Sequence, residues 1–265
     1  MNLTIAFQMI AADVLKLRRS RGPMVAALVL SVGIIVLYFG VMEVRRNANL
    51  GGTEGFLNGI TLLGIYFGSF AAILIGTEAG TADVTSGVFR DLVATGRSRT
   101  ALFLVRVPAA ITVALVFTFS GFLVTLGATF AFSGSAPTPD LGLILRSAGW
   151  VVVATAVVTS LAVGVGSLTG SRSLTLTAVI GWQTIASTLL YTAVFLGSAR
   201  DGVLLIALSH LRPGKHYGAP DSPGSSGALA DLDLPMATAV AVLVIIAWTV
   251  VPTIAGAWRT RNQDA

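Results

Sequence analysis

Residues 78–106 read EAGTADVTSGVFRDLVATGRSRTALFLVR, and they form a long, arginine-rich polar segment between two apolar stretches. Residues 87–95 can form a short helix, because Val88 and Leu92 fall on one side of it. Gly96 ends this helix, since glycine tolerates the left-handed conformation that follows many helices. The charged residues of the segment are Glu78, Asp83, Arg90, Asp91, Arg97, Arg99 and Arg106. We therefore expect a short, charged helix at one membrane face, where another protein docks.

The composition is that of an integral membrane protein. Of the 265 residues, 54% are hydrophobic and 11% are charged, whereas soluble domains carry about 25% charged residues. The absence of cysteine excludes disulfides, thiol catalysis and cysteine-ligated metals. The isoelectric point near 10.2 could indicate nucleic-acid binding. The basic residues gather at the ends of apolar stretches, however, so membrane orientation and anionic lipid explain them, and no nucleic acid is expected.

Long stretches without charge predict an all-α integral membrane protein with one transmembrane domain over residues 1–265. Each stretch reaches the ~20 residues that a helix needs to cross the hydrocarbon core. The predicted spans are residues 23–42, 56–77, 107–132, 147–170, 173–198 and 235–258. The polar segment 78–106 joins spans 2 and 3, and residues 199–233 form the largest loop, on the opposite face.

Residues 2–17 are expected to form an amphipathic helix that lies in the membrane interface. A disordered leader is the alternative. Asp13 interrupts the apolar run that a signal peptide requires, and Asp13 and Lys16 fall on polar faces of the predicted helix. The apolar residues at helical spacing are Leu3, Ala6, Phe7, Ile10, Val14 and Leu17.

The distribution of lysine and arginine predicts that both termini are cytoplasmic. With this orientation, eleven basic residues lie on the inner side and six on the outer side. Cytoplasmic segments carry the excess of lysine and arginine. The polar segment 78–106 is then cytoplasmic, and Arg172 between spans 4 and 5 is interpreted as a charge that sets orientation.

Span 2 carries small residues at every fourth position. They are Gly64, Gly68, Ala72 and Gly76. Such a stripe allows close approach of another helix, and the sequence leaves open whether that helix belongs to the same chain or to a second subunit.

Span 5 is the most polar of the six predicted spans. Gln183, Ser187 and Tyr191 fall on one of its faces. Polar side chains inside a membrane hold helices together or line a pathway, and both interpretations stay open here.

The chain lacks the residues of several membrane activities. The predicted spans hold no Asp, Glu, His, Lys or Arg in their interior, which argues against a proton-coupled carrier. There is no HExxH motif and no GxxxxGK[ST] motif. We therefore expect no catalytic residue, no metal and no cofactor on this chain, and a pump built on it requires ATP hydrolysis by another polypeptide.

The polar segment resembles the first cytoplasmic loop of type-2 ABC exporter permeases. The similarity rests on Asp83, Gly87, Leu92, Ala94, Gly96, Ser98, Arg99 and Arg106, while Val88 and Gly96 stand where the family often has Thr and Pro. The resemblance implies that this loop is the coupling helix that contacts the ATP-binding subunit. The implied coupling residues are Asp83, Gly87, Arg90, Leu92, Gly96, Arg97, Ser98 and Arg99. It also implies an N-terminal elbow helix, and a short helix near residues 202–211 that enters the membrane from outside.

The resemblance implies a function as the permease subunit of an ATP-driven exporter in a bacterial cell membrane. Its cargo would be a small molecule, drug, lipid or peptide. The implied partners are an ATP-binding cassette subunit, which holds ATP and Mg, and a second copy of the chain or a paralogous permease. The alternative is a six-span scaffold or sensor-associated subunit that transports nothing.

Overall fold

The structure is a computed structural model that describes residues 3–44, 52–85, 98–214 and 236–262. Every regular element in these ranges is a helix, which confirms the all-α prediction. The elements in chain order are α1 (Leu3–Arg19), α2 (Arg21–Leu28), η1 (Val29–Gly33), α3 (Ile34–Val44), α4 (Gly52–Thr61), η2 (Leu62–Tyr66), α5 (Phe67–Thr85), α7 (Arg99–Ala131), α8 (Leu141–Thr169), α9 (Arg172–Gly181), η3 (Trp182–Ala186), α10 (Ser187–Thr192), η4 (Val194–Gly202), α11 (Leu204–His210) and α12 (Thr238–Asn262).

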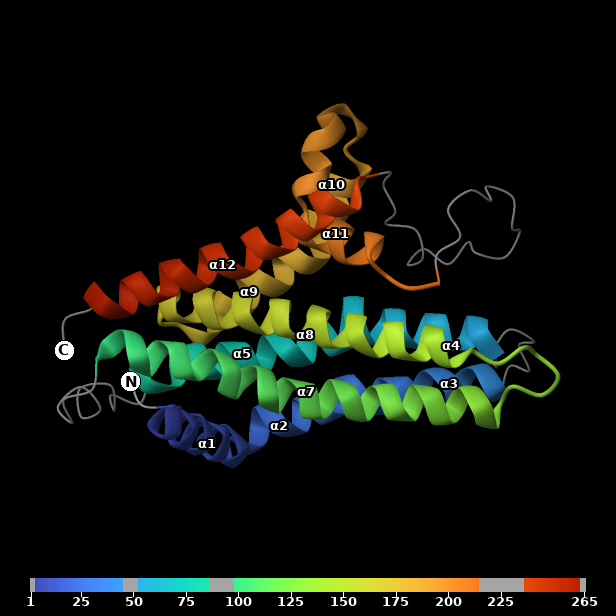
Figure 1. Cartoon of the computed structure of the whole chain (residues 1–265), viewed down its shortest axis with the longest axis horizontal. Coiled ribbons are helices and arrows are strands. Elements are labelled where there is room, and N and C mark those ends of the chain that lie inside the picture. Colours follow the sequence, from blue (N-terminus) through green and yellow to red (C-terminus); the bar gives the residue numbers. More distant parts are fainter. Residues whose placement is uncertain (1–2, 45–51, 86–97, 215–235, 263–265) are drawn as a thin grey trace.

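Among the described residues, six helical stretches are long and apolar enough to cross a membrane, which confirms the predicted number of spans. They are Arg21–Val44, Gly52–Asp83, Arg99–Ala131, Leu141–Thr169, Arg172–Leu190 and Thr238–Asn262. Spans 1 to 4 run along the long axis of the molecule, and α12 crosses them obliquely (Figure 1). Spans 2 and 4 are the most buried of the six.

Spans 2 and 4 lie at the centre because small residues bring their backbones together. A Cβ atom on Gly76 would lie 2.6 Å from the Thr159 carbonyl oxygen of α8. A Cβ atom on Gly64 would overlap the ring of Trp150, also on α8. The stripe Gly64, Gly68, Ala72 and Gly76 is buried inside the chain, so it packs against a neighbouring span of the same chain.

The helices around the polar segment are longer than predicted. Span 2 was expected to end at residue 77 and span 3 to begin at residue 107, because charged residues follow and precede these positions. Instead α5 continues to Thr85 and α7 already begins at Arg99. Asp83 and Arg106, which lie in these extra turns, pair with each other inside the protein, so the helices continue through them.

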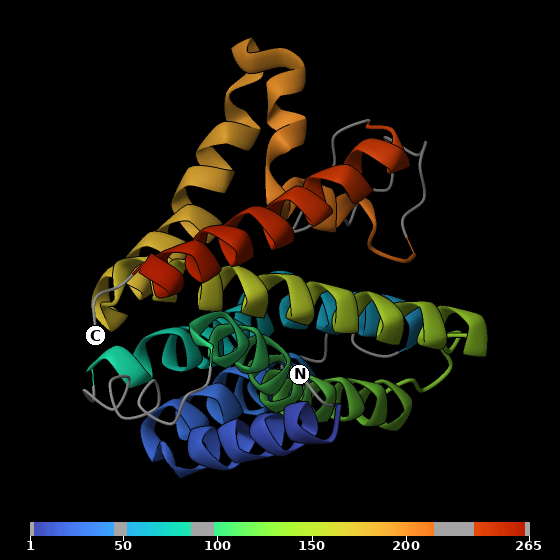
Figure 2. The same ribbon diagram turned by 60° about the vertical axis from the view of Figure 1, so that its left-hand side comes forward.

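Span 5 is shorter than predicted, because its helix ends at Thr192 rather than near residue 198. The chain then turns back through η4, where Gly197 has a φ of +52°. Figure 2 shows the gold and orange hairpin that results, extending away from the other spans. Phe195 in this hairpin is 88% exposed.

Polar residues fix where α7, α8 and α9 begin. The side chain of Asp140 accepts hydrogen bonds from the backbone N–H groups of Gly142 and Leu143. Ser98 and Ser171 cap α7 and α9 in the same way, and such caps typically stabilise a helix by about 1 kcal/mol. Gly170 ends α8 with a φ of +62°, which a glycine adopts without strain.

Candidate functional site

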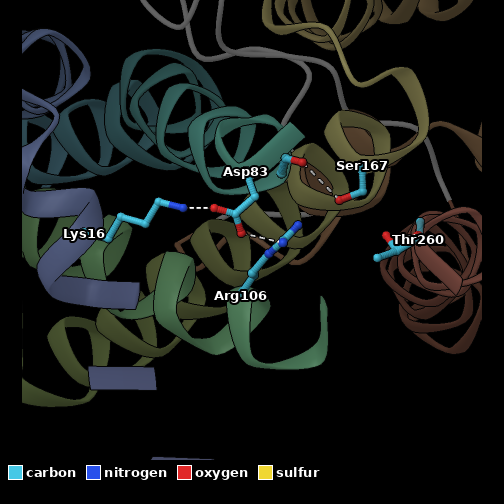
Figure 3. A network of polar contacts seen from close by, with 7 residues as sticks. Lys16, Asp83, Arg106, Ser167 and Thr260 are labelled. Carbon is cyan, nitrogen blue, oxygen red and sulfur yellow. Dashed lines mark hydrogen bonds and ion pairs between the residues drawn. The ribbon is translucent and has the colours of Figure 1, made fainter. Parts of the chain in front are cut away.

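Three helices meet at the buried carboxylate of Asp83, near the end of α5. Arg106 of α7 donates a hydrogen bond from Nη2 to Asp83 Oδ2 at 2.5 Å. Lys16 of α1 pairs with the other carboxylate oxygen, Oδ1. Figure 3 shows both cations directed at this one side chain. We call Lys16, Asp83 and Arg106 the Asp83 clasp.

Burial makes the pairing within the clasp necessary. Asp83 and Arg106 are each only 4% exposed. Removing a charge from water costs several kcal/mol, and a well-placed partner is what offsets this cost. The side chain of Lys16 is 45% exposed, so water screens its contribution. The Asp83–Arg106 pair is therefore the strong part of the clasp, and Lys16 adds α1 to it.

A small pocket beside the clasp includes two charged residues of α1. The lining residues are Asp13, Lys16, Leu17, Ala79, Ala82, Asp83 and Arg106. Asp13 and Lys16, predicted on faces other than the apolar one, thus line this pocket with residues of α5 and α7. The ion pair with Asp83 offsets the cost of partly burying the Lys16 ammonium group. Phe7 and Leu15 are exposed instead.

Burial at this pocket shifts the pKa values of Asp13 and Lys16 on α1. Burial raises the pKa of Asp13, and the positive charges of Arg106 and Lys16 partly oppose that rise. Burial also lowers the pKa of Lys16, with a further contribution from Arg106 and an opposing one from Asp13 and Glu78. Within the described ranges, no three side chains of Asp, Glu or His are grouped so as to hold a metal ion.

A second set of contacts holds α5 from another side. Glu78 of α5 pairs with Arg172 at the start of α9, with 3.4 Å between Oε2 and Nη1. Ser167 of α8 donates a hydrogen bond to the Gly80 carbonyl oxygen at 3.3 Å, as Figure 3 shows beside the clasp. The last turns of α5 are thus joined to four helices: α1, α7, α8 and α9. Arg172, interpreted from the sequence as a charge that sets orientation, also has this structural contact.

The remaining predicted coupling residues divide into two groups. Gly87, Arg90, Leu92, Gly96 and Arg97 lie outside the described residues. Ser98 is exposed and its side chain accepts a hydrogen bond from the Ala101 N–H at 3.3 Å. Arg99 donates from Nη1 to the Arg261 carbonyl oxygen at 3.5 Å, which links the start of α7 to the end of α12.

The position of Asp83 differs from the one that the resemblance implied for a coupling residue. Its carboxylate is turned into the protein and is engaged by Arg106 and Lys16. It therefore does not offer a surface contact to another subunit.

The polar face of span 5 contacts span 2. Gln183 is buried and donates from Nε2 to the Ile65 carbonyl oxygen at 3.5 Å. Ile65 lies in η2 and Gln183 in η3, both of which are single π-helical turns. Such turns interrupt the regular helical hydrogen bonding and occur frequently at functional sites. Ser187 donates to the Trp182 carbonyl oxygen at 2.9 Å, and the side chain of Tyr191 lies outside the described residues.

The apolar piece expected near residues 202–211 is buried deeply in the molecule. It contains α11, and Val203 to His210 are all buried. The indole N–H of Trp150 donates to the Leu208 carbonyl oxygen at 2.9 Å, and Arg212 donates to the Thr61 hydroxyl at 2.6 Å. Spans 2 and 4 therefore hold this short helix in place.

Comparison with known protein families shows which family the chain belongs to. Residues 5–265 match the family described as ABC-2 family transporter protein. The chain belongs to this family. As a type-2 ABC permease, it is a multi-pass membrane protein and the permease subunit of an ABC transporter, a role that implies association with an ATP-binding cassette subunit. No curated protein and no solved structure matched the chain.

Proposed function

We propose that this ABC-2 permease is the membrane subunit of a bacterial exporter, driven by ATP hydrolysis on a separate cassette subunit. The observation that carries the proposal is the Asp83 clasp. It joins the helices that enter and leave residues 86–97, α5 and α7, and ties both of them to α1. Because these helices are linked by ion pairs, the segment that connects them can transmit the movement of a docked partner to the spans.

The proposed route of this movement begins at residues 86–97 and continues along α5. This helix packs along most of its length against α8, so a displacement of its end also displaces α8. Gly164 of α8 and Gly256 of α12 then make a second close contact, where a Cβ atom on Gly256 would lie 2.9 Å from the Gly164 carbonyl oxygen. Interfaces packed this tightly move as units rather than deform gradually.

The proposal includes the partners and the direction of transport. The cassette subunits bind ATP and Mg, and two of them assemble with this chain and a second permease, identical or paralogous. Both termini lie in the cytoplasm, as the distribution of arginine and lysine indicates. A small molecule, drug, lipid or peptide leaves along the interface between permeases near spans 2 and 5. The proposed contacts to the cassette subunit come from Gly87, Arg90, Leu92, Gly96, Arg97, Ser98 and Arg99.

The experiment is the reversal of one charge at the proposed docking loop. The chain is expressed together with a candidate ATP-binding cassette subunit, and the complex is purified from membranes. Arg99→Glu is expected to reduce recovery of the cassette subunit and its ATPase activity in the complex, because a charge that faces the partner changes sign. Trp258 is exposed near the end of α12, and Trp258→Phe serves as the control that retains normal assembly.

Reporter fusions show whether the variant still inserts into the membrane with the wild-type orientation. Ten inner basic residues remain against six outer ones in Arg99→Glu, so a reporter after residue 261 should still read cytoplasmic. If the variant inserts normally and assembles with an active cassette subunit as well as the wild type does, these residues do not couple the subunits. A wild-type chain that recovers no cassette subunit would favour a non-transporting scaffold.

A further inference from the structure

Three exposed arginines gather where α1 ends and span 1 begins. They are Arg18, Arg19 and Arg21, and we call them the basic elbow. Among the residues that the structure describes, none of the three forms an ion pair. Asp83 holds Lys16 and Arg106, and Glu78 holds Arg172, so neither carboxylate pairs with the basic elbow, and Asp13 on the same helix forms no ion pair with it either. The basic elbow therefore presents positive charge that the protein does not compensate.

The same helix exposes large apolar side chains before the arginines. Phe7 is 69% exposed and Leu15 is 59% exposed. Arg18 follows Leu15 by three positions and Phe7 by eleven, which is about three helical turns, so these residues share one face of α1. The outward face of α1 thus exposes two large apolar side chains and is basic at its end.

We propose that the basic elbow binds the headgroup of an anionic phospholipid, whose acyl chains lie against Phe7 and Leu15. A phospholipid has both parts that this face requires, whereas free phosphate and nucleic acid lack the apolar part. Arginine pairs well with phosphate oxygens because its guanidinium donates two parallel hydrogen bonds. α1 is then held on two sides, by Asp83 within the protein and by lipid outside it.

The chain has no cysteine, so one introduced cysteine can carry a fluorophore without further changes. Ala12 is exposed on α1 and is not one of the proposed contacts, so Ala12→Cys places the probe beside the site. The labelled full-length chain is placed in nanodiscs of phosphatidylcholine with increasing fractions of phosphatidylglycerol. A trace of phosphatidylglycerol carries a quencher on its acyl chain. Quenching then measures how much anionic lipid lies next to α1.

The expected result is saturable quenching at a low fraction of phosphatidylglycerol in the wild type. Arg18→Gln should raise the fraction needed for half-maximal quenching about fivefold, which corresponds to ~1 kcal/mol for one basic residue near a charged surface. Arg18→Lys keeps the charge and should stay near the wild-type value. Arg259→Gln is the matched control, since Arg259 is exposed near the end of α12 and should leave quenching beside α1 unchanged.

Three results would overturn the proposal, in variants whose circular dichroism shows the wild-type helix content. The first is a wild-type titration curve in Arg18→Gln. The second is an equal shift in Arg259→Gln, which means that the lipid responds to the general charge of this membrane face. The third is loss of quenching when inorganic phosphate is added, which means that the site takes phosphate alone. The measurement needs no cassette subunit, so it is independent of the proposed transport function.

Discussion

Replacing Asp83 by Asn tests the Asp83 clasp most severely. The substitution keeps the size of the side chain but leaves the guanidinium of Arg106 buried without its acidic partner. Asp83 and Arg106 are both 4% exposed and are joined by a direct hydrogen bond of 2.5 Å. Breaking a buried ion pair by removing one partner costs about 3–5 kcal/mol. We expect Asp83→Asn to lower the free energy of unfolding by this amount.

The assay is a double-mutant cycle on the purified chain in detergent micelles, with helix content followed during denaturant titration. Asp83→Asn, Arg106→Gln and the double variant are compared, and the double variant should lose clearly less than the two single losses added together. Lys16→Gln is the internal control and should cost less than about 1 kcal/mol, because the Lys16 side chain is 45% exposed. Losses below about 1 kcal/mol in both single variants, or strictly additive losses, would refute the view that the clasp stabilises the protein.

Two further predictions concern helix packing and pH. Gly68→Leu should strongly lower the yield of folded protein, because its Cβ would overlap the backbone carbonyl of Leu63 in the π-helical turn η2 of the same span. Gly127→Leu should be tolerated, since a Cβ there meets nothing within 4 Å, and equal yields of the two in a solubilised-fraction assay would show that the backbone around Gly68 adapts. Burial raises the pKa of Asp13, so the folded chain binds this proton at higher pH than the unfolded chain does. The melting temperature of the wild type relative to Asp13→Asn should therefore rise as the pH falls from about 7 towards the ordinary value of 3.8, and a constant difference would contradict this.

The number of spans could be predicted because it depends on length and on the absence of charge. Stretches of ~20 uncharged residues have few alternatives to a helix across the bilayer. The stripe from Gly64 to Gly76 predicted close packing for a similar reason, since backbones approach closely only where side chains are small. The partner helix could not be predicted, and it is α8 of the same chain.

The buried charges were missed because the predicted spans ended wherever a charged residue appeared. This criterion assumes that each charge stands alone and must reach water. Asp83 and Arg106 are 23 positions apart in the sequence, and only the packing of α5 against α7 brings them together. Their pairing removes the need for water, so both helices continue through them. The ion pair between Glu78 and Arg172 was not predicted, for the same reason.

The local geometry of the helices within the spans also could not be predicted from sequence patterns. The π-helical turns η2 and η3 involve no proline, and they shift the register of the residues that follow. The reversal after Thr192 depends on Gly197 in a chain with 29 glycines, so that residue alone is a weak signal. Both features depend on contacts between spans that are distant in sequence, such as the hydrogen bond from Gln183 to Ile65.

The proposed docking site for an ATP-binding cassette subunit is residues 87–99, between α5 and the start of α7. Site-specific cross-linking tests it most directly, because the chain contains no cysteine. Ser98 is exposed at the start of α7, and Val116 is 60% exposed within span 3. A photoreactive cross-linker attached to Ser98→Cys in native membranes should capture the cassette subunit, and the same cross-linker on Val116→Cys should not. No capture from position 98, or equal capture from both positions, would contradict the claim.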